Sequence, residues 1–269
     1  MAGDTAIYGI VGENIGYSRS PEIFAALFRK HKIDAIYQRF DLGRHQLAAF
    51  AIAVRTAPIA GFNVTIPHKE SVAELLKSCD AIAAATGAVN FVMNQAGKLC
   101  GYNTDYAGIA ASIEKKLDFD VAGTNVAVVG SGGAARTVFY YLIKKHAANV
   151  KVQHHSKARE KSFSAWAEKI KGKTNYKSEL MGAANASVEG ADLVINCTPI
   201  LIRKLFDKKT AAAMPRVFEL RYGGGRKQSR TYVSGEYMLA VQACEAFRIM
   251  SGKTERPETI MRLVNKAAP

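Results

Sequence analysis

The sequence predicts an α/β protein with two domains. In the N-terminal part, short β-rich runs alternate with stretches whose apolar residues recur at helical spacing, a pattern typical of a sheet covered by helices. Further along, a strand-like run at 125–130 is followed by a turn of small residues and a helix, and a second strand follows one helix later. This is the βαβ pattern of a parallel sheet. A chain of 269 residues is long enough for two modest cores.

The expected elements follow in order. Ser20, Pro21 and Glu22 combine an N-cap residue, a proline suited to the first helical turn and an early acid, so a helix is expected there. Thr104 is expected to cap another helix. Strands are expected at 6–12, 36–42, 59–66, 125–130, 150–153, 191–197 and 216–222, and a hairpin at 91–102. The other helices are expected at 46–54, 70–79, 136–144, 236–251 and 257–266.

Composition narrows the function classes. The chain has 37 Lys and Arg against 23 Asp and Glu, a formal net charge of +14, but the basic residues are dispersed and no aromatic-interleaved RNA motif is present. Anionic small ligands are therefore favoured over nucleic acid. No run is long and apolar enough to span a membrane, and the start lacks the regions of a signal peptide, so a soluble, cytoplasmic protein is expected. The four cysteines are far apart, which indicates free thiols and no metal site.

The clearest local motif is Gly130-x-Gly132-x-x-Ala135, placed after a strand and before a helix. In such a turn the first glycine permits the tight bend, the second lets the backbone approach a pyrophosphate, and the small third residue allows close packing. The amides at the helix start favour an anion. The motif therefore predicts dinucleotide binding, with a merely structural turn as the alternative.

The end of the following strand reports on the type of dinucleotide. An acid about 20 residues after the glycines would hold the ribose of NAD. Here 153–159 reads Gln-His-His-Ser-Lys-Ala-Arg, with no acid before Glu160. These cations suit the additional phosphate of NADP, which is therefore expected over NAD; a solvated basic loop is the alternative. His154 and His155 would point to opposite sides of a strand, so a metal site is not expected.

Several short motifs together resemble the shikimate dehydrogenase family, and the resemblance covers nearly the whole chain. The motifs are Ser18-Arg-Ser-Pro21, Asn63-Val-Thr-Ile-Pro-His-Lys69, Gly87-Ala-Val-Asn90, Asn103-Thr-Asp105, Gly130-Ser-Gly-Gly-Ala-Ala-Arg136, and Met238-Leu239 with Gln242-Ala243.

The resemblance implies a fold and a reaction. It implies a substrate-binding α/β domain at 1–103, completed by helices at 236–269, a Rossmann-type NADP-binding domain at 104–235, and an active site in the cleft between them. The implied reaction is the reversible NADPH-dependent reduction of 3-dehydroshikimate to shikimate, in the chorismate pathway of aromatic amino acid biosynthesis. A monomer or homodimer is expected, with neither nucleic acid nor membrane as partner.

Roles are carried over residue by residue from the family pattern. The expected catalytic residues are Lys69 and Asp105. The expected substrate-binding residues are Ser18, Ser20, Thr65, Asn90, Tyr222 and Gln242. The expected cofactor-binding residues are Gly130, Ser131, Gly132, Gly133, Ala134, His154, His155, Ser156, Arg159, Thr198 and Gly235.

The chemistry suits these assignments. Negative charge develops on the ketone oxygen as a hydride arrives, so a nearby cation and proton donor lowers the barrier. Lys69 can supply both, and Asp105 can hold the lysine and share its proton. Each of the expected catalytic and substrate-binding residues also has a plainer structural interpretation. Ser20, for example, could be only an N-cap, and Asp105 only an acid in a first helical turn. His68 has no role in the family pattern and is expected to be structural.

The match departs from the family pattern mainly on the cofactor side. His154-His155-Ser156 replaces Asn-Arg-Thr, Pro199 removes a backbone donor, and Tyr237 replaces the last residue of Gly-Leu-Gly. Phe91 also replaces a usual Thr. We therefore expect altered dinucleotide affinity or preference. Three alternatives remain: a paralogue that acts on quinate or a related hydroxy acid with an altered cofactor preference such as NAD, a catalytically silent carboxylate- or dinucleotide-binding protein, and a nucleic-acid binder suggested only by charge.

Overall fold

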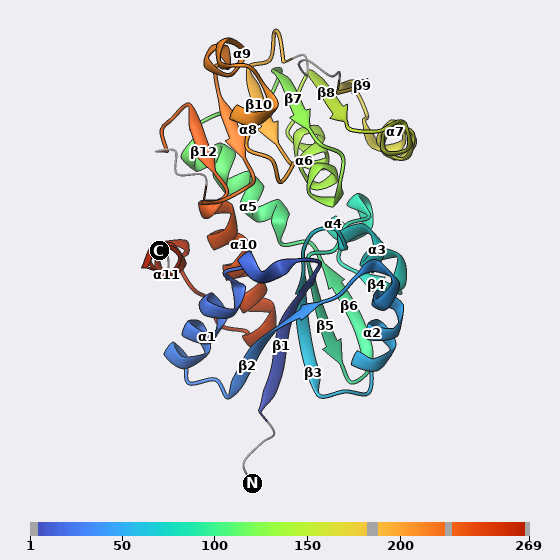
Figure 1. The fold of residues 1–269 in the computed structure, drawn as a ribbon, viewed down its shortest axis with the longest axis vertical. Coiled ribbons are helices and arrows are strands. Elements are labelled where there is room, and N and C mark those ends of the chain that lie inside the picture. The colour runs from blue at the N-terminus through green and yellow to red at the C-terminus, as the bar shows by residue number, and fades with distance from the viewer. Residues whose placement is uncertain (1–4, 182–187, 224–227, 267–269) are drawn as a thin grey trace. The chain divides into compact units, whose positions relative to one another are not determined.

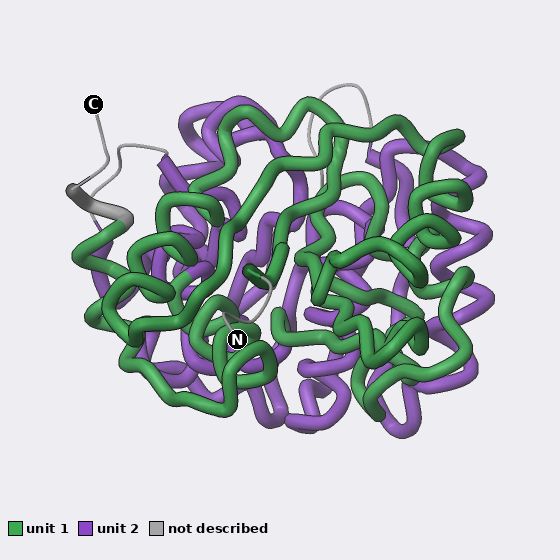
Figure 2. The backbone as a smooth tube through the Cα atoms, turned by 90° about the horizontal axis from the view of Figure 1, so that it is seen from below, with its two compact units in different colours: residues 1–105, 240–269 green, residues 106–239 purple. Residues whose placement is uncertain are grey.

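The computed structural model describes residues 5–181, 188–223 and 228–266. The chain forms two compact units, which Figure 2 distinguishes by colour. Unit 1 comprises 1–105 with 240–269, and unit 2 comprises 106–239. The α/β class expected from the sequence is confirmed. The expected functional division, with boundaries at 103 and 235, stays a prediction.

Unit 1 is built on a mixed six-stranded sheet in the order β2-β1-β3-β5-β6-β4 (Figure 1). Strand β1 pairs in parallel with β2 and β3, β5 is antiparallel to β3 and β6, and β4 is parallel to β6. Its elements are β1 (Ala6–Gly12), η1 (Ile15–Tyr17), α1 (Ser20–Lys30), β2 (Ala35–Asp41), η2 (Arg44–Gln46), α2 (Leu47–Val54), β3 (Ile59–Val64), α3 (Lys69–Leu75), β4 (Ser78–Cys79), α4 (Ala81–Thr86), β5 (Phe91–Gln95), β6 (Lys98–Tyr102), most of α10 (Glu236–Ser251), and α11 (Pro257–Lys266).

The two faces of this sheet are covered by different helices, because successive strand residues point to opposite faces. On one face, Phe62 of β3 packs in a cluster with Val54 of α2 and Val72 of α3. On the other face, Phe24 of α1 stacks on Tyr37 of β2, with ring centroids 4.7 Å apart and an interplanar angle of 8°. This stacking fixes helix α1, which begins at the expected substrate residue Ser20, over β2.

Unit 2 contains a fully parallel six-stranded sheet in the order β12-β11-β10-β7-β8-β9. This is the strand order of a Rossmann fold, with the order reversing between β7 and β10. Its elements are α5 (Asp105–Ala111), η3 (Ser112–Lys116), β7 (Asn125–Val129), α6 (Gly133–Lys144), β8 (Asn149–His154), α7 (Lys157–Ile170), β9 (Asn175–Leu180), β10 (Leu193–Asn196), α8 (Ile202–Leu205), α9 (Lys208–Ala213), β11 (Val217–Glu219) and β12 (Tyr232–Ser234).

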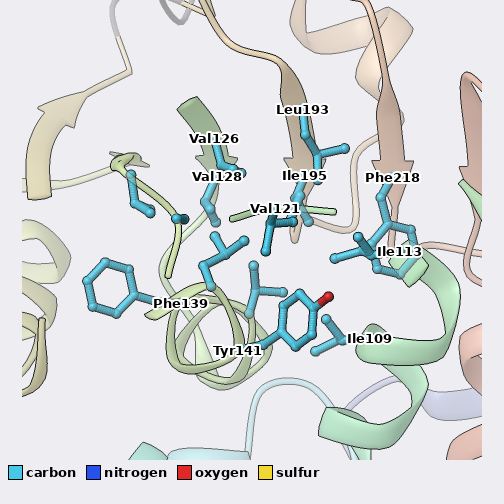
Figure 3. Packing of buried hydrophobic residues seen from close by; sticks show 14 of the residues in the cluster. Ile109, Ile113, Val121, Val126, Val128, Phe139, Tyr141, Leu193, Ile195 and Phe218 are labelled. Atoms are coloured by element: carbon cyan, nitrogen blue, oxygen red, sulfur yellow. The ribbon is translucent and has the colours of Figure 1, made fainter. Parts of the chain in front are cut away.

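The core of unit 2 lies between this sheet and its helices. Val128 and Ile195 of the central strands pack in one cluster with Phe139 and Tyr141 of α6 and Ile109 of α5 (Figure 3). All five side chains are almost fully buried. Because both β7 and α6 are packed into this core, the turn between them is held in place at both ends.

Two expected elements are corrected. The helix expected at 70–79 ends at Leu75, because Leu76 is extended and Ser78–Cys79 forms β4 beside β6. Ser20 is the first residue of α1 rather than its cap; Arg19 is the N-cap residue, and no side-chain cap hydrogen bond forms. Ser20 therefore has a side chain available for other partners.

Within the described ranges, no helix is both long and apolar enough to cross a membrane.

His154, the last residue of β8, is fully buried. Its ring meets Phe163 of α7 edge-on, at 5.5 Å between centroids, and neither ring nitrogen has a hydrogen-bond partner among the described residues. Burial lowers the pKa of His154, and the charge of Glu160 only partly opposes that shift. The imidazole is therefore held neutral in the core.

We expect this buried histidine to destabilise the fold in acid. Folded His154 binds a proton less readily than unfolded His154, so stability is lost as the pH falls below about 6.5, with a limiting slope of about 1.4 kcal/mol per pH unit for one proton. His154→Leu should lose less stability over this range. Urea unfolding of both proteins between pH 7.5 and 5, at roughly half-unit steps, measures the difference; parallel pH profiles would contradict the assignment.

Candidate active site

Lys69 and Asp105 form an ion pair in unit 1. Lys69 is the first residue of α3, directly after the turn that follows β3, and Asp105 is the first residue of α5. Their side chains are 15% and 5% exposed. The structure thus brings together two residues that lie 36 positions apart in the sequence, and it places their charges largely out of water.

Asn90 is the centre of the hydrogen-bond network around this pair. Its amide nitrogen donates to Asp105 Oδ1 at 2.9 Å and to Thr104 Oγ1 at 2.8 Å, and it lies 3.5 Å from Gln242 Oε1 on α10. Its amide oxygen accepts from the Thr104 backbone N–H at 2.7 Å. Asn90, Asp105 and Gln242 are all buried. Four of the expected site residues, counting Lys69, therefore share one continuous network.

This arrangement can handle protons beside a polar ligand. Asp105 uses one carboxylate oxygen for Lys69 and the other for Asn90, so the lysine is held by a carboxylate that is itself fixed. An ammonium group held in this way can donate a hydrogen bond to a ligand oxygen that gains negative charge. The neighbouring amide and hydroxyl groups can both donate and accept, which suits a ligand with several hydroxyls.

Ser18 and Ser20 lie between η1 and the first turn of α1, and both are buried. Ser18 Oγ accepts from the Ser20 backbone N–H at 3.3 Å, and Arg39 Nη2 of β2 donates to the Ser18 carbonyl at 2.7 Å. Thr65 follows β3 and is half-buried. Gly12 allows this part of the chain to approach closely, because a Cβ there would lie 2.5 Å from the Thr65 methyl carbon.

The glycine turn of unit 2 has open space for a ligand. Gly130 has a φ of 104°, a conformation that favours glycine. Gly132 is exposed, and a Cβ there would meet nothing within 4 Å. The Ser131 hydroxyl is buried without a partner among the described residues. Gly133 and Ala134 begin α6, whose 12 residues give a full helix N-terminus behind the turn.

The expected cofactor residues at and after the end of β8 differ in their surroundings. The His154 side chain is buried against α7, so it presents no charge at the surface; this corrects its expected role as a phosphate-binding cation. His155 is exposed, and Ser156 caps α7 by accepting from the Arg159 backbone N–H at 3.3 Å. The half-buried Arg159 lies in the first turn of that helix.

Thr198 follows β10 and lies beside the glycine turn, since a Cβ on Gly130 would be 3.1 Å from its methyl carbon. Its hydroxyl donates to Asn196 Oδ1 at 2.8 Å. The motifs gave no role to Glu219, yet this buried carboxylate holds the loop. One of its oxygens accepts from Asn196 Nδ2 at 3.2 Å and from the Ile202 N–H at 2.7 Å, and the other accepts from the Tyr232 hydroxyl at 2.7 Å.

Gly235 permits a close backbone approach, because a Cβ at this position would lie 2.0 Å from the Leu220 carbonyl oxygen. Tyr237 is buried, and the Lys116 ammonium group lies 4.3 Å from the centre of its ring. The tyrosine ring is therefore engaged with η3 and does not project freely beside Gly235. Tyr222 is half-buried in the loop after β11, in unit 2.

His68 is buried, and its Nε2 lies 2.6 Å from the Leu42 carbonyl oxygen, which joins the start of α3 to the segment after β2. Within the part of the chain that the structure describes, no three His, Cys, Asp or Glu side chains gather into a group that could hold a metal ion.

Comparison with known proteins agrees with the motifs. Residues 10–92 match the shikimate dehydrogenase substrate binding domain. The shikimate dehydrogenase (NADP(+)) of Methanopyrus kandleri is 31% identical over 277 residues, which cover 96% of this chain and 94% of that protein. A crystal structure of a shikimate dehydrogenase in complex with NADP+ is 26% identical, with a TM-score of 0.82 over 98% of this chain and 96% of that chain.

A related fold occurs in the quinate dehydrogenase of Corynebacterium glutamicum, solved in complex with NAD. Its TM-score is 0.81 over 97% of this chain and 99% of that chain, at 23% identity. This likeness concerns the fold alone. The identity to the Methanopyrus protein, sustained over almost the full length of both chains, goes further. It confirms the resemblance seen in the motifs, and this chain belongs to the shikimate dehydrogenase family.

Proposed function

We propose that this protein catalyses the reversible NADPH-dependent reduction of 3-dehydroshikimate to shikimate, as a cytoplasmic monomer or homodimer in aromatic amino acid biosynthesis. The observation that carries the proposal is the buried network of Lys69, Asp105, Asn90 and Gln242. The full-length relatives named shikimate dehydrogenase (NADP(+)) support the same reaction.

The substrate has two chemically different ends, and we assign them to two groups of side chains in unit 1. The hydroxyls of Ser18 and Ser20 receive the carboxylate. Thr65, Asn90 and Gln242 receive ring hydroxyls, and Tyr222 keeps the substrate-binding role that the family pattern gives it. Buried polar groups of this kind discriminate strongly, because a ligand that lacks a matching hydroxyl leaves them unpaired.

Lys69 and Asp105 act as one proton-handling unit in this proposal. The bound nicotinamide supplies or accepts the hydride. During reduction, Lys69 donates a hydrogen bond and then a proton to the carbonyl oxygen, and in the reverse direction the pair receives that proton. Asp105 keeps the ammonium group oriented, while Asn90 holds Asp105 from its other oxygen. Removing either partner would leave a buried charge without compensation.

The residues of unit 2 fit a dinucleotide. The amides at the start of α6, the open space over Gly132 and the Ser131 hydroxyl, which has no partner among the described residues, suit a pyrophosphate. No acid lies between the end of β8 and Glu160 to hold the ribose of NAD, whereas His155, Ser156 and Arg159 suit the 2′-phosphate of NADP.

The absorbance of reduced nicotinamide tests the reaction directly. Purified protein is mixed with shikimate or quinate and with NADP or NAD, in all four pairs. Turnover of shikimate with NADP is expected. Turnover only with quinate or only with NAD would instead favour the paralogue, and no turnover with any pair would favour a silent binding protein.

Lys69→Ala should lower kcat for shikimate by about 10²- to 10⁴-fold, the usual contribution of a positioned acid or base. Lys77→Ala is the matched control, because Lys77 is exposed in the segment after α3 and should leave kcat unchanged. Circular dichroism establishes that both variants are folded. A folded Lys69→Ala protein with wild-type kcat would overturn the catalytic assignment.

His155→Arg should tighten NADP binding about tenfold, because a guanidinium group is permanently charged and binds phosphate oxygens in bidentate fashion. Isothermal titration measures the dissociation constants of NADP and NAD for both proteins. NAD is the internal control, since it lacks the 2′-phosphate and its affinity should change little. Equal tightening of both dinucleotides would show that His155 does not face the 2′-phosphate.

A further inference from the structure

The carboxylate of Glu236, in the first turn of α10, ties the loop after β11 to the start of that helix. Its Oε1 accepts from the Gly223 backbone N–H at 2.9 Å. Its Oε2 accepts from Gln228 Nε2 at 3.3 Å and also from the Ser234 hydroxyl. All four residues belong to unit 2. One side chain therefore holds this loop at two separate points and is itself held by the strand that precedes α10.

Tyr222 lies between two anchored residues of this loop. On one side, the Arg221 carbonyl accepts from the Gly235 backbone N–H at 3.1 Å. On the other side, Gly223 donates to Glu236. The first bond uses main-chain atoms only, so it does not depend on the side chains present. The second bond exists because residue 236 carries an acceptor, and it makes the backbone at Tyr222 depend on Glu236.

The local sequence does not supply this restraint. Gly223 has a φ of 77°, a conformation that favours glycine, and a Cβ there would meet nothing within 4 Å. It is also the first of three consecutive glycines in the sequence. Ordering a glycine costs more conformational entropy than ordering any other residue. A hydrogen bond to a charged acceptor is stronger than one to a neutral acceptor, so the contact with Glu236 opposes that cost.

The three donors around residue 236 match a carboxylate. A carboxylate only accepts, and its two oxygens together offer enough lone pairs for three hydrogen bonds. An acid is also favoured in the first turn of a helix by the helix dipole. The Ser234 hydroxyl is buried, so an apolar side chain at position 236 would remove the acceptor of a buried donor as well as the contact with Gly223.

We propose that Glu236 is a positioning residue that holds Tyr222 in the orientation in which it meets the substrate. This inference rests on the proposed function, in which Tyr222 has a substrate-binding role. Glu236 acts through Tyr222 and is not itself a ligand contact. By ordering the loop in advance, it lowers the entropy that Tyr222 loses when the substrate binds. Its contribution therefore lies in KM, and the proton transfer by Lys69 and Asp105 does not depend on it.

Glu236→Ala tests the proposal through the kinetics of shikimate oxidation. KM for shikimate should rise about tenfold, the usual worth of one hydrogen bond to a charged group. On the same reasoning, kcat and the dissociation constant of NADP should change less than about twofold. Glu236→Gln should restore most of the affinity, because its amide oxygen can still accept from Gly223. Glu245→Ala is the matched control, since this acid lies on the same helix but pairs with Arg248.

A double-mutant cycle shows whether the effect passes through Tyr222. Tyr222→Ala alone should raise KM for shikimate. Adding Glu236→Ala to it should cost little more, because the side chain that Glu236 positions is gone. If Glu236→Ala does not fold, Ser234→Ala removes a donor that holds the carboxylate, and it should give a smaller rise in KM that is again lost in the Tyr222→Ala background.

Tryptic cleavage measures the order of the loop without reference to activity. Arg221 and Arg230 are both exposed, and mass spectrometry identifies the cuts after each. Glu236→Ala should be cut there faster than the wild-type protein and faster than Glu245→Ala, because losing the bond to Gly223 raises the population of the open loop.

Several results would overturn the proposal. These are an unchanged KM in a folded Glu236→Ala protein, a loss in Glu236→Gln as large as in Glu236→Ala, and an undiminished effect in the Tyr222→Ala background. Wild-type cleavage rates in Glu236→Ala would show that the carboxylate does not order the loop. Absence of shikimate turnover in the wild-type protein would instead refute the proposed function, whereas the cleavage experiment would still decide whether Glu236 holds the loop.

Discussion

The buried carboxylate of Asp105 is the constraint on which the polar architecture of unit 1 depends. It is 4% exposed, and a charge in such a place is tolerated only when it is paired and hydrogen-bonded. Lys69 supplies the opposite charge and Asn90 the second hydrogen bond. These three residues come from the start of α3, the segment before β5 and the start of α5. The same contacts that make Asp105 tolerable bring together the groups that we propose bind and protonate the substrate.

Unit 2 contains another buried acid, Glu219, whose carboxylate is also held by hydrogen bonds. Glu219 accepts hydrogen bonds from Asn196, from the first amide of α8 and from Tyr232. These bonds connect the carboxyl ends of β10 and β11 to β12 and to the loop that carries Thr198. In parallel sheets that edge is where ligands bind. A loop that must present groups to a dinucleotide is thereby ordered by a carboxylate that need not touch the ligand.

Periodicity and turn chemistry predicted most of the fold, but only where local sequence decides the structure. The strand–glycine turn–helix unit at 125–144 was predictable because small residues and a buried strand leave few other conformations. The polar strand β9 and the three-residue strand β12 carry no comparable pattern, and sheet pairing alone forms them. The segment 76–79 was misread as helix because its pairing with β6 is a non-local contact. Among candidate site residues, motifs indicated Lys69 and Asp105, whereas Glu219 orders its loop through contacts that sequence spacing does not reveal. His154 was misjudged because an alternating strand hides which face a helix will cover.

We propose that unit 1 holds a hydroxylated ring carboxylate between the two serines and the Lys69–Asp105 pair. A crystal structure of the protein soaked with shikimate and NADP+ would show the position of the ligand. We expect the carboxylate on the hydroxyls of Ser18 and Ser20, with one ring hydroxyl within hydrogen-bond distance of both Lys69 Nζ and Asp105. Shikimate bound away from these side chains, or with its carboxylate on Lys69, would contradict this assignment.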